Sequence, residues 1–383
     1  MKQDIIKHIV SMEKELYDIS KYLYENPEES FCEHKAHDYL INILRNNNFE
    51  IKENFLDIST AFIAKFGNGH PKICYICEYD CGCKKGHIVG SNLVSSMSIG
   101  AAIGLSKVIP KTGGTVIVLG CPGEFLGGSK VIMSKQGVFD DIDVVLTAHP
   151  SIMNANCCSS PAVLPININY DCTKKSQFEK AHSFTPFDAC LFTLNSINTI
   201  VKGYSKNCSI DKISINGSLA RVIEPNTITT KFYIKAPNMC IAEEIKDKIN
   251  TIACHLNDLM DIKATVTLPE VPCEDFKCNK NLTRIFSHNL KEAGIIDIHE
   301  DINLPYGLSL GNVCSLVPTL KYLVKISEND SIRFASEDFA KETLSEFARH
   351  KVLDVSKALA LTGFDLIDNE DLLREIKEET LGC

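Results

Sequence analysis

Apolar residues in the first 150 positions follow two patterns. One repeats with the period of an α-helix and predicts helices over residues 4–25 and 33–46. The other is a short, continuous apolar run of the kind found in buried strands, and it predicts strands at 49–55, 61–66, 73–77, 114–120 and 143–148. Compact helices at 97–104 and 129–136 separate the later strands. Strands that alternate with helices indicate an α/β domain with a mainly parallel sheet and a site at the carboxyl ends of its strands.

The pattern changes near residue 165. Strands and helices from there to residue 268 follow the order β-α-β-β-α-β, which is typical of a ferredoxin-like domain. The α/β pattern returns at 269 and ends in one long amphipathic helix, predicted over 337–368. We therefore expect a discontinuous first domain, residues 1–165 and 269–383, interrupted by a second domain at 166–268.

Composition narrows the classes of function. The net charge of −9 and the lack of a basic tract argue against a nucleic-acid partner. No apolar run reaches the roughly 20 residues of a membrane helix, and the first residues lack the apolar core of a signal peptide. These features predict a cytoplasmic protein. The 17 cysteines are scattered, many in apolar segments such as those of Cys74, Cys77, Cys190, Cys240 and Cys254, so we expect free buried thiols rather than a disulfide framework.

Several short motifs occur in one order along the chain. The central one runs from Glu78-Tyr-Asp80 through Gly86-His87 to Asn92, between a predicted strand and a predicted helix. Others are Asn26-Pro-Glu, Gly120-Cys-Pro-Gly-Glu124, Gly127-Gly-Ser-Lys130, Ala148-His-Pro150, Ala181-His182, Ile223-Glu-Pro-Asn226 and Gly311-Asn-Val313. Together they resemble the M20 family of metallopeptidases and amidohydrolases, in the branch of aminoacylase-1-like and aminobenzoyl-glutamate hydrolase-like proteins. The resemblance implies a zinc-peptidase-like catalytic domain interrupted by a ferredoxin-like lid that dimerises.

The resemblance also implies a pair of metal ions that this chain is poorly equipped to bind. The family's cysteine and second histidine ligands fall on Val89 and Ser91, and its ligand glutamate falls on Phe125. The last family histidine falls near residues 334–335, Phe-Ala, and the aspartate of another family loop on Ser309. Only His149 matches a ligand position, while Glu124 keeps the position of the general base. Because two divalent ions need several anionic or imidazole ligands, we expect no cofactor and no dinuclear hydrolysis.

Three alternatives remain open for the chemistry. In the first, the chain binds a small-molecule or peptide-like ligand and has a binding or regulatory role. In the second, a mononuclear zinc site uses Cys83 or Cys81 with His87 and His149 and cleaves an N-acyl or peptide-like amide. In the third, Glu124 and His149 act as a metal-free acid–base pair. A four-cysteine site that includes Cys74 and Cys77 is disfavoured, because an offset of three in a strand places these two on opposite faces.

Ligand contacts are predicted from matching family positions. Asn92, Asn312 and the lid residue His182 occupy such positions, and Arg221 lies near the place of a family asparagine, where its guanidinium suits an anionic group. The resemblance further implies a homodimer formed through the lid.

Overall fold

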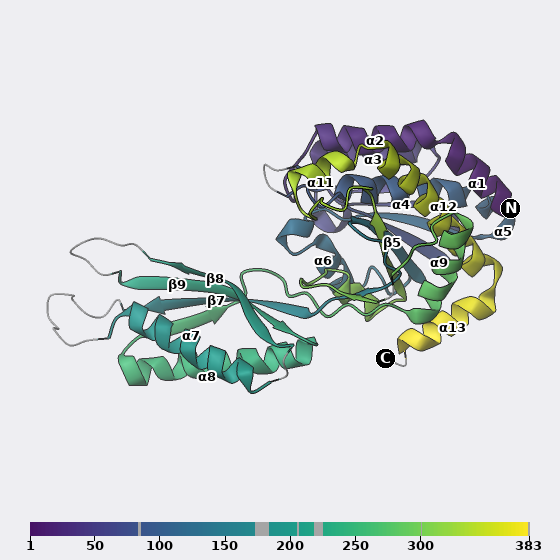
Figure 1. Ribbon diagram of the computed structural model, residues 1–383. Helices are drawn as coiled ribbons and strands as arrows, with labels where there is room; N and C mark the ends of the chain where they lie inside the picture. The colour runs from purple at the N-terminus through teal and green to yellow at the C-terminus, as the bar shows by residue number, and fades with distance from the viewer. Residues whose placement is uncertain (83–85, 173–183, 205–206, 218–224, 300, 382–383) are drawn as a thin grey trace. The chain divides into compact units, whose positions relative to one another are not determined.

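The computed structural model describes residues 1–82, 86–172, 184–204, 207–217, 225–299 and 301–381 (Figure 1). The chain forms two compact units. Unit 1 consists of Met1–Ser159, Lys277–Leu304 and Asn312–Cys383, and unit 2 of Ser160–Phe276 and Pro305–Gly311. The insertion predicted at 166–268 lies within unit 2.

Unit 1 contains a six-stranded sheet in the order β1-β2-β4-β3-β5-β12. Strands β4, β3, β5 and β12 run parallel to one another, and β1 and β2 form an antiparallel edge. This sheet confirms the predicted α/β class with a largely parallel sheet. Its strands are β1 (Glu50–Glu53), β2 (Phe62–Asn68), β3 (Lys72–Cys77), β4 (Gly114–Gly120), β5 (Val144–Ser151) and β12 (Thr319–Lys325), and a separate short pair joins β6 (Cys158–Ser159) to β11 (Ile302–Asn303).

The central helix of unit 1 is α4 (Ser91–Ser106), every residue of which is buried. It contacts strands β3, β4 and β5 on one side and helices α1, α2 and α12 on the other. This double burial explains its run of small and apolar residues. The remaining helices are α1 (Lys2–Ser11), α2 (Glu13–Glu25), α3 (His34–Asn46), α5 (Ile109–Thr112), α6 (Ser129–Lys135), α9 (Lys280–Glu292), α10 (Gly311–Cys314), α11 (Glu337–Glu342), α12 (Glu346–Asp368) and α13 (Glu370–Leu381), with single turns η1 (Phe55–Asp57) and η3 (Glu124–Leu126).

Three helix predictions were wrong in their bounds. The helix predicted over 4–25 is two helices that meet at Met12, whose ψ of 5° is not helical. The helix predicted over 337–368 is interrupted at Ser345, whose hydroxyl accepts a hydrogen bond from the Ala348 N–H and caps α12. Helix α4 begins at Ser91, six residues earlier than expected, because polar side chains near its start are buried against β3.

Unit 2 has the predicted β-α-β-β-α-β order. Its antiparallel sheet, β10-β7-β9-β8, packs against two helices that lie on the same face (Figure 1). Alternate residues of β7 point into the core, and α8 supplies residues at helical spacing, such as Ile245 and Ile249. The elements are β7 (Ala162–Asp171), α7 (Pro186–Lys202), β8 (Ser209–Asn216), β9 (Thr227–Ala236), α8 (Met239–Met260) and β10 (Lys263–Thr267).

Most described cysteines are free. Cys74, Cys77 and Cys190 are buried as expected, whereas Cys240 and Cys254 are exposed because they lie on the outer side of α8. One pair departs from the expectation of free thiols, since Cys157 and Cys278 form a disulfide. Within the described part of the chain, no helix is long and apolar enough to cross a membrane.

Candidate functional site at the strand ends

Three neighbouring parallel strands deliver polar side chains to one edge of the sheet. Glu78 directly follows β3, Glu124 lies on the turn after β4, and His149 lies near the end of β5. Since parallel strands end at the same edge, these residues converge although 71 positions separate the first from the last. Two of them, Glu124 and His149, were predicted site residues.

A buried lysine joins the two glutamates. Lys130, on α6, is fully buried, and its Nζ lies 2.7 Å from Glu78 Oε1 and 2.5 Å from Glu124 Oε1. Burial alone would raise the pKa of Glu78, but Lys130 and then Lys321 lower it to about 2. Burial alone would lower the pKa of Lys130, but the two carboxylates raise it above its ordinary value. The site therefore holds an internal cation between two ionised carboxylates.

Asp80 adds a third carboxyl group with the opposite behaviour. Its Oδ2 accepts hydrogen bonds from the Ser30 hydroxyl, at 2.7 Å, and the Phe125 N–H, at 3.1 Å. Among the described residues, its buried Oδ1 has no hydrogen-bond partner. Burial, with a further contribution from Glu124, raises the pKa of Asp80 to about 7. Near neutral pH this group therefore exchanges a proton inside the site.

The loop that bears Glu124 is fixed from below by Glu33. This buried carboxyl accepts hydrogen bonds from the Gly123 N–H at 3.0 Å, the Phe31 N–H at 2.8 Å and the Thr60 hydroxyl at 2.9 Å. Gly123 has a φ of +82°, and a Cβ there would lie 2.2 Å from the ring of Phe31, so only glycine fits. Glu33 is thus a positioning residue for the turn that carries Glu124.

His149 is held neutral. Its Nδ1 lies 2.9 Å from the Pro150 carbonyl, to which an N–H at that position donates. Desolvation, and then the nearby Lys321, lower the pKa of His149 to about 4. The ring of Phe334, where the family resemblance calls for a histidine, lies 6.2 Å from the His149 ring, centroid to centroid. An apolar ring therefore stands where a second imidazole would be needed.

His87 and Ser91 form a separate buried network. The Ser91 Oγ lies 2.5 Å from the Asp80 carbonyl and 2.8 Å from His87 Nδ1, and His87 Nε2 donates to the Leu23 carbonyl at 3.0 Å. Burial lowers the pKa of His87 to about 4. Both ring nitrogens are thus engaged within the protein, so binding of a metal by His87 would require one of these contacts to break.

The remaining predicted ligand residues are distributed differently from expectation. Asn92 is fully buried, and its amide donates to the Ser20 carbonyl at 3.2 Å and to Thr343 Oγ1 at 3.0 Å, so it links α4 to its neighbours. Asn312 is buried in α10. Cys83, His182 and Arg221 lie outside the described residues.

The residues at the strand ends do not fit the family's pair of metal ions. Val89 and Phe125 offer no side-chain ligand atom, and Phe125 contributes only its backbone N–H to Asp80. In the described part of the chain, one group of three His, Cys, Asp or Glu donors lies close enough together to hold an ion, and it is Cys157, Cys278 and Asp301, not the strand-end residues. A dinuclear centre would also have to displace Lys130 from its two carboxylates.

A cavity lies in the same unit, in the segment that follows β12. It has a volume of about 420 Å³ and is lined by mainly polar and charged residues, namely Asn329, Ser331, Ile332, Arg333, Ser336, Asp338, Lys341 and Glu342. Phe334, whose ring neighbours that of His149, belongs to the same segment and connects the cavity to the strand-end site. The mixture of two cationic and two anionic side chains suits a ligand that carries both charges.

Sequence reasoning missed the residues that set the charge of the site. Lys130 entered only as part of a motif, and Lys321 and Asp80 were not identified as site residues. A lysine inside an otherwise apolar strand or beside paired glycines was the available signal, because such a charge is buried only when it is paired.

The fold and this site define a class: an α/β metallopeptidase-type unit interrupted by a ferredoxin-like unit. Comparisons with known proteins agree. The chain is 26% identical to the Xaa-Arg dipeptidase of Mus musculus over 406 residues, which cover 99% of this chain and 92% of that protein. It is 28% identical over 263 residues to one of the subunits of p-aminobenzoyl-glutamate hydrolase from Escherichia coli (strain K12), covering 62% of this chain and 54% of the relative. No protein-family model matches the chain.

Solved structures share the fold at low identity. An aminobenzoyl-glutamate utilization protein from Klebsiella pneumoniae aligns with a TM-score of 0.70 at 11% identity, covering 94% of this chain and 98% of that one. A dinuclear metal binding peptidase of the M20 family from Bacillus subtilis aligns with a TM-score of 0.65 at 13% identity, covering 92% and 99%. The chain is a homologue of the M20 peptidase and aminohydrolase group, as its motifs predicted.

Proposed function

We propose that this M20 homologue binds a peptide-like ligand at the strand-end site and does not hydrolyse amides through a dinuclear metal centre. The observation that carries the proposal is the position of Lys130, between Glu78 and Glu124. A general base on a metal-bound water must be free to accept a proton, whereas Glu124 is paired with an ammonium whose pKa is raised. The positive charge of the site is supplied by the protein itself.

The ligand that fits best is a small amide with a free carboxylate. Both named relatives carry in their names a compound of this kind, a dipeptide in one and p-aminobenzoyl-glutamate in the other. The cavity beside Phe334 offers Arg333 and Lys341 to a carboxylate and Asp338 and Glu342 to a cationic group. A binding or regulatory role for the chain follows from retention of such a pocket without the metal ligands.

Binding and turnover can be separated on the purified chain. Arginine-terminated dipeptides and p-aminobenzoyl-glutamate are titrated by calorimetry, and their cleavage is followed by chromatography with and without added zinc. We expect saturable binding that Arg333→Ala weakens about tenfold, as for the loss of a charge-assisted contact. No cleavage is expected under either condition.

The alternative, an amidohydrolase with one zinc ion held by Cys83, His87 and His149, predicts a different result. It requires stoichiometric zinc that falls with Cys83→Ala and with His149→Ala, and cleavage that a chelator abolishes. The metal analysis is made with the Cys157–Cys278 disulfide closed, so that these two sulfurs cannot contribute ligands. Zinc-dependent cleavage that both variants abolish would refute the binding proposal.

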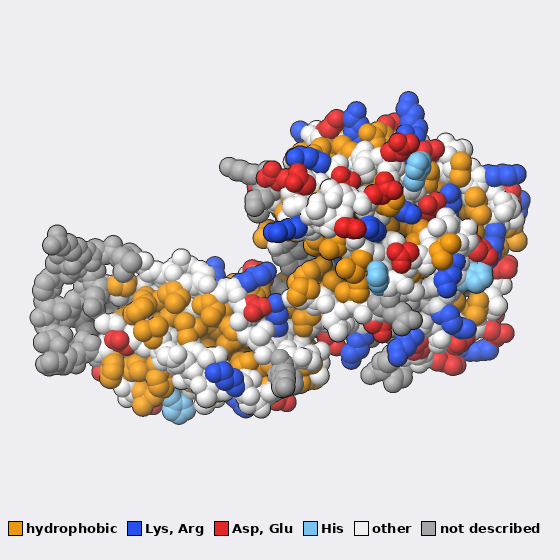
Figure 2. All heavy atoms as spheres, viewed as in Figure 1, with side chains coloured by type: hydrophobic (Ala, Val, Ile, Leu, Met, Phe, Trp, Pro, Cys, Tyr) orange, Lys and Arg blue, Asp and Glu red, His pale blue; other side chains and the backbone are white. Residues whose placement is uncertain are grey.

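We further propose that two copies associate through unit 2. Strand β8 is an edge of its sheet, and it exposes Ile213 and Ile215 by 52% and 42%. Apolar side chains gather on the visible face of this unit (Figure 2). An edge strand with apolar side chains is able to pair with a second copy, which would cover both its backbone groups and these residues.

A further inference from the structure

Cys157 and Cys278 occupy a special position in the chain. Cys157 immediately precedes β6, near the point where the chain leaves unit 1 after Ser159. Cys278 lies directly after Lys277, where the chain re-enters unit 1. The two residues are 121 positions apart, yet their Cα atoms are 6.0 Å apart and their sulfurs are bonded. The two segments that lead to and from unit 2 are therefore joined at their unit 1 ends.

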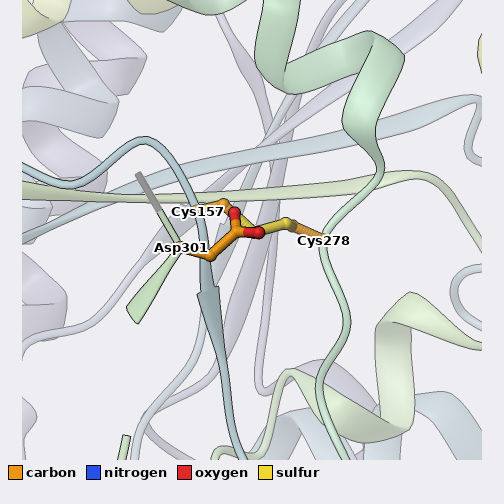
Figure 3. A group of neighbouring side chains, drawn as sticks. All are labelled: Cys157, Cys278 and Asp301. Carbon is orange, nitrogen blue, oxygen red and sulfur yellow. A yellow bond between two sulfur atoms is a disulfide. The ribbon is translucent and has the colours of Figure 1, made fainter. Parts of the chain in front are cut away.

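A third ionisable side chain is brought to this pair by strand pairing. Strand β11 runs parallel to β6 with Ile302 opposite Cys158, and the Ile302 N–H donates to the Cys157 carbonyl at 3.1 Å. This register places Asp301 beside Cys157. One carboxylate oxygen of Asp301 and the sulfurs of both cysteines all lie within 4.8 Å of one another, and the carboxylate faces the two sulfurs (Figure 3).

The donor set has the chemistry of a zinc ligand group. Thiolates prefer thiophilic ions such as Zn²⁺, and a carboxylate is an ordinary additional ligand for that ion. When the cysteines are reduced, two thiolates and one carboxylate at this spacing repel one another, and a divalent cation would relieve that repulsion. Exposure rises from buried Cys157 through Cys278 to exposed Asp301, so an ion has a path of entry and water has access to a fourth position.

We propose that Cys157, Cys278 and Asp301 form a binding site for a thiophilic divalent cation, distinct from the strand-end site. The disulfide is the cation-free form of this site. Two-electron oxidation of the two thiolates forms the S–S bond and releases the ion, while a low-molecular-weight disulfide accepts the electrons and is cleaved to two thiolates. Reduction restores both sulfur ligands. Occupancy of the site is thus tied to the redox state of one cysteine pair.

Cobalt titration of the full-length chain tests the site, because thiolate ligands give Co²⁺ a sulfur-to-metal charge-transfer band. The protein is reduced with a phosphine, which does not compete as a thiol, and zinc is then counted by displacement. We expect one equivalent of cobalt with a thiolate band that zinc removes. Treatment with oxidised glutathione before the titration should abolish the band.

Variants make the assignment specific. Cys278→Ser should remove the band, and Asp301→Asn, which keeps both sulfurs, should weaken cobalt binding by at least the roughly tenfold typical of a lost supporting contact. Cys240→Ser, at an exposed free cysteine, and His149→Ala, at the strand-end site, should change neither. A reduced wild-type chain without the band would overturn the proposal, as would a band that persists in Cys278→Ser or cobalt affinity that Asp301→Asn leaves unchanged.

Discussion

The Nζ of Lys130 lies 2.5 Å from the Oε1 of Glu124, the residue at the family's general-base position. The same ammonium is fully buried and reaches Glu78 on its other side, at 2.7 Å. Two carboxylates in a desolvated site repel each other unless a cation lies between them, and here that cation is covalently part of the chain. The site is therefore neutralised without a bound ion.

Replacing Lys130 by methionine should be strongly destabilising. The change keeps most of the side-chain volume but leaves Glu78 and Glu124 buried without a counter-charge, and breaking a buried pair in this way costs about 3 to 5 kcal/mol. Chemical denaturation measures the loss. Lys135→Met, on the exposed side of the same helix, serves as the control and should cost far less. Adding Glu78→Gln to Lys130→Met should recover part of the loss, and equal costs for the two lysine variants would contradict the ion-pair account.

Asp80 gives the folded chain a stability that falls as the pH rises. Its pKa is raised to about 7 from an ordinary value of 3.8, so between these values the folded state holds a proton that the unfolded state has lost. The stability it contributes is complete below about pH 4 and is lost by about pH 7. Asp80→Asn keeps an acceptor for Ser30 and cannot ionise, so its stability relative to the wild type should increase from pH 5 to pH 8. Exposed Asp140→Asn should show no such trend, and a pH-independent difference for Asp80→Asn would argue against the raised pKa.

The sequence determined the order of elements well because burial on both faces leaves a strong signal. The apolar runs that became β3, β4 and β5 were predicted with starts within a residue of the observed ones. Helix boundaries were harder, because Met12 and Ser345 interrupt apolar patterns that continue on both sides of them. The break at Ser345 depends on a side-chain cap, which a hydrophobic period does not reveal.

The site was predictable in position but not in charge. Strand ends and motif spacing located Glu124 and His149, since both depend on the order of strands in the sheet. The pairing of Lys130 with two glutamates depends on where α6 packs, and the partnering of Cys157 with Cys278 depends on contacts 121 residues apart. Neither follows from local sequence, because scattered cysteines and single lysines are most often unrelated to one another.

Glu33 should control the rigidity of the turn that carries Glu124. Glu33→Ala removes the acceptor of the Gly123 N–H, the Phe31 N–H and the Thr60 hydroxyl, and each buried donor left unpaired costs about 1 to 3 kcal/mol. Hydrogen exchange at the Gly123 amide should accelerate in this variant. Glu33→Gln keeps a carbonyl oxygen for the two N–H groups and should exchange much more slowly than Glu33→Ala. Identical exchange in both variants would remove Glu33 from its positioning role.

Association through β8 predicts a charge-sensitive dimer. Lysines at Ile213 and Ile215 would place like charges opposite each other at a two-fold interface, and lysine on an edge strand blocks pairing with another chain. Light scattering coupled to gel filtration should give a dimer for the wild type and a monomer for Ile213→Lys combined with Ile215→Lys. Leu259→Lys changes a similarly exposed apolar residue of unit 2, on α8, and should remain dimeric. A dimer that survives the double change but not Leu259→Lys would move the interface to the helical face, because only the surface that loses apolar contact on association can carry this sensitivity.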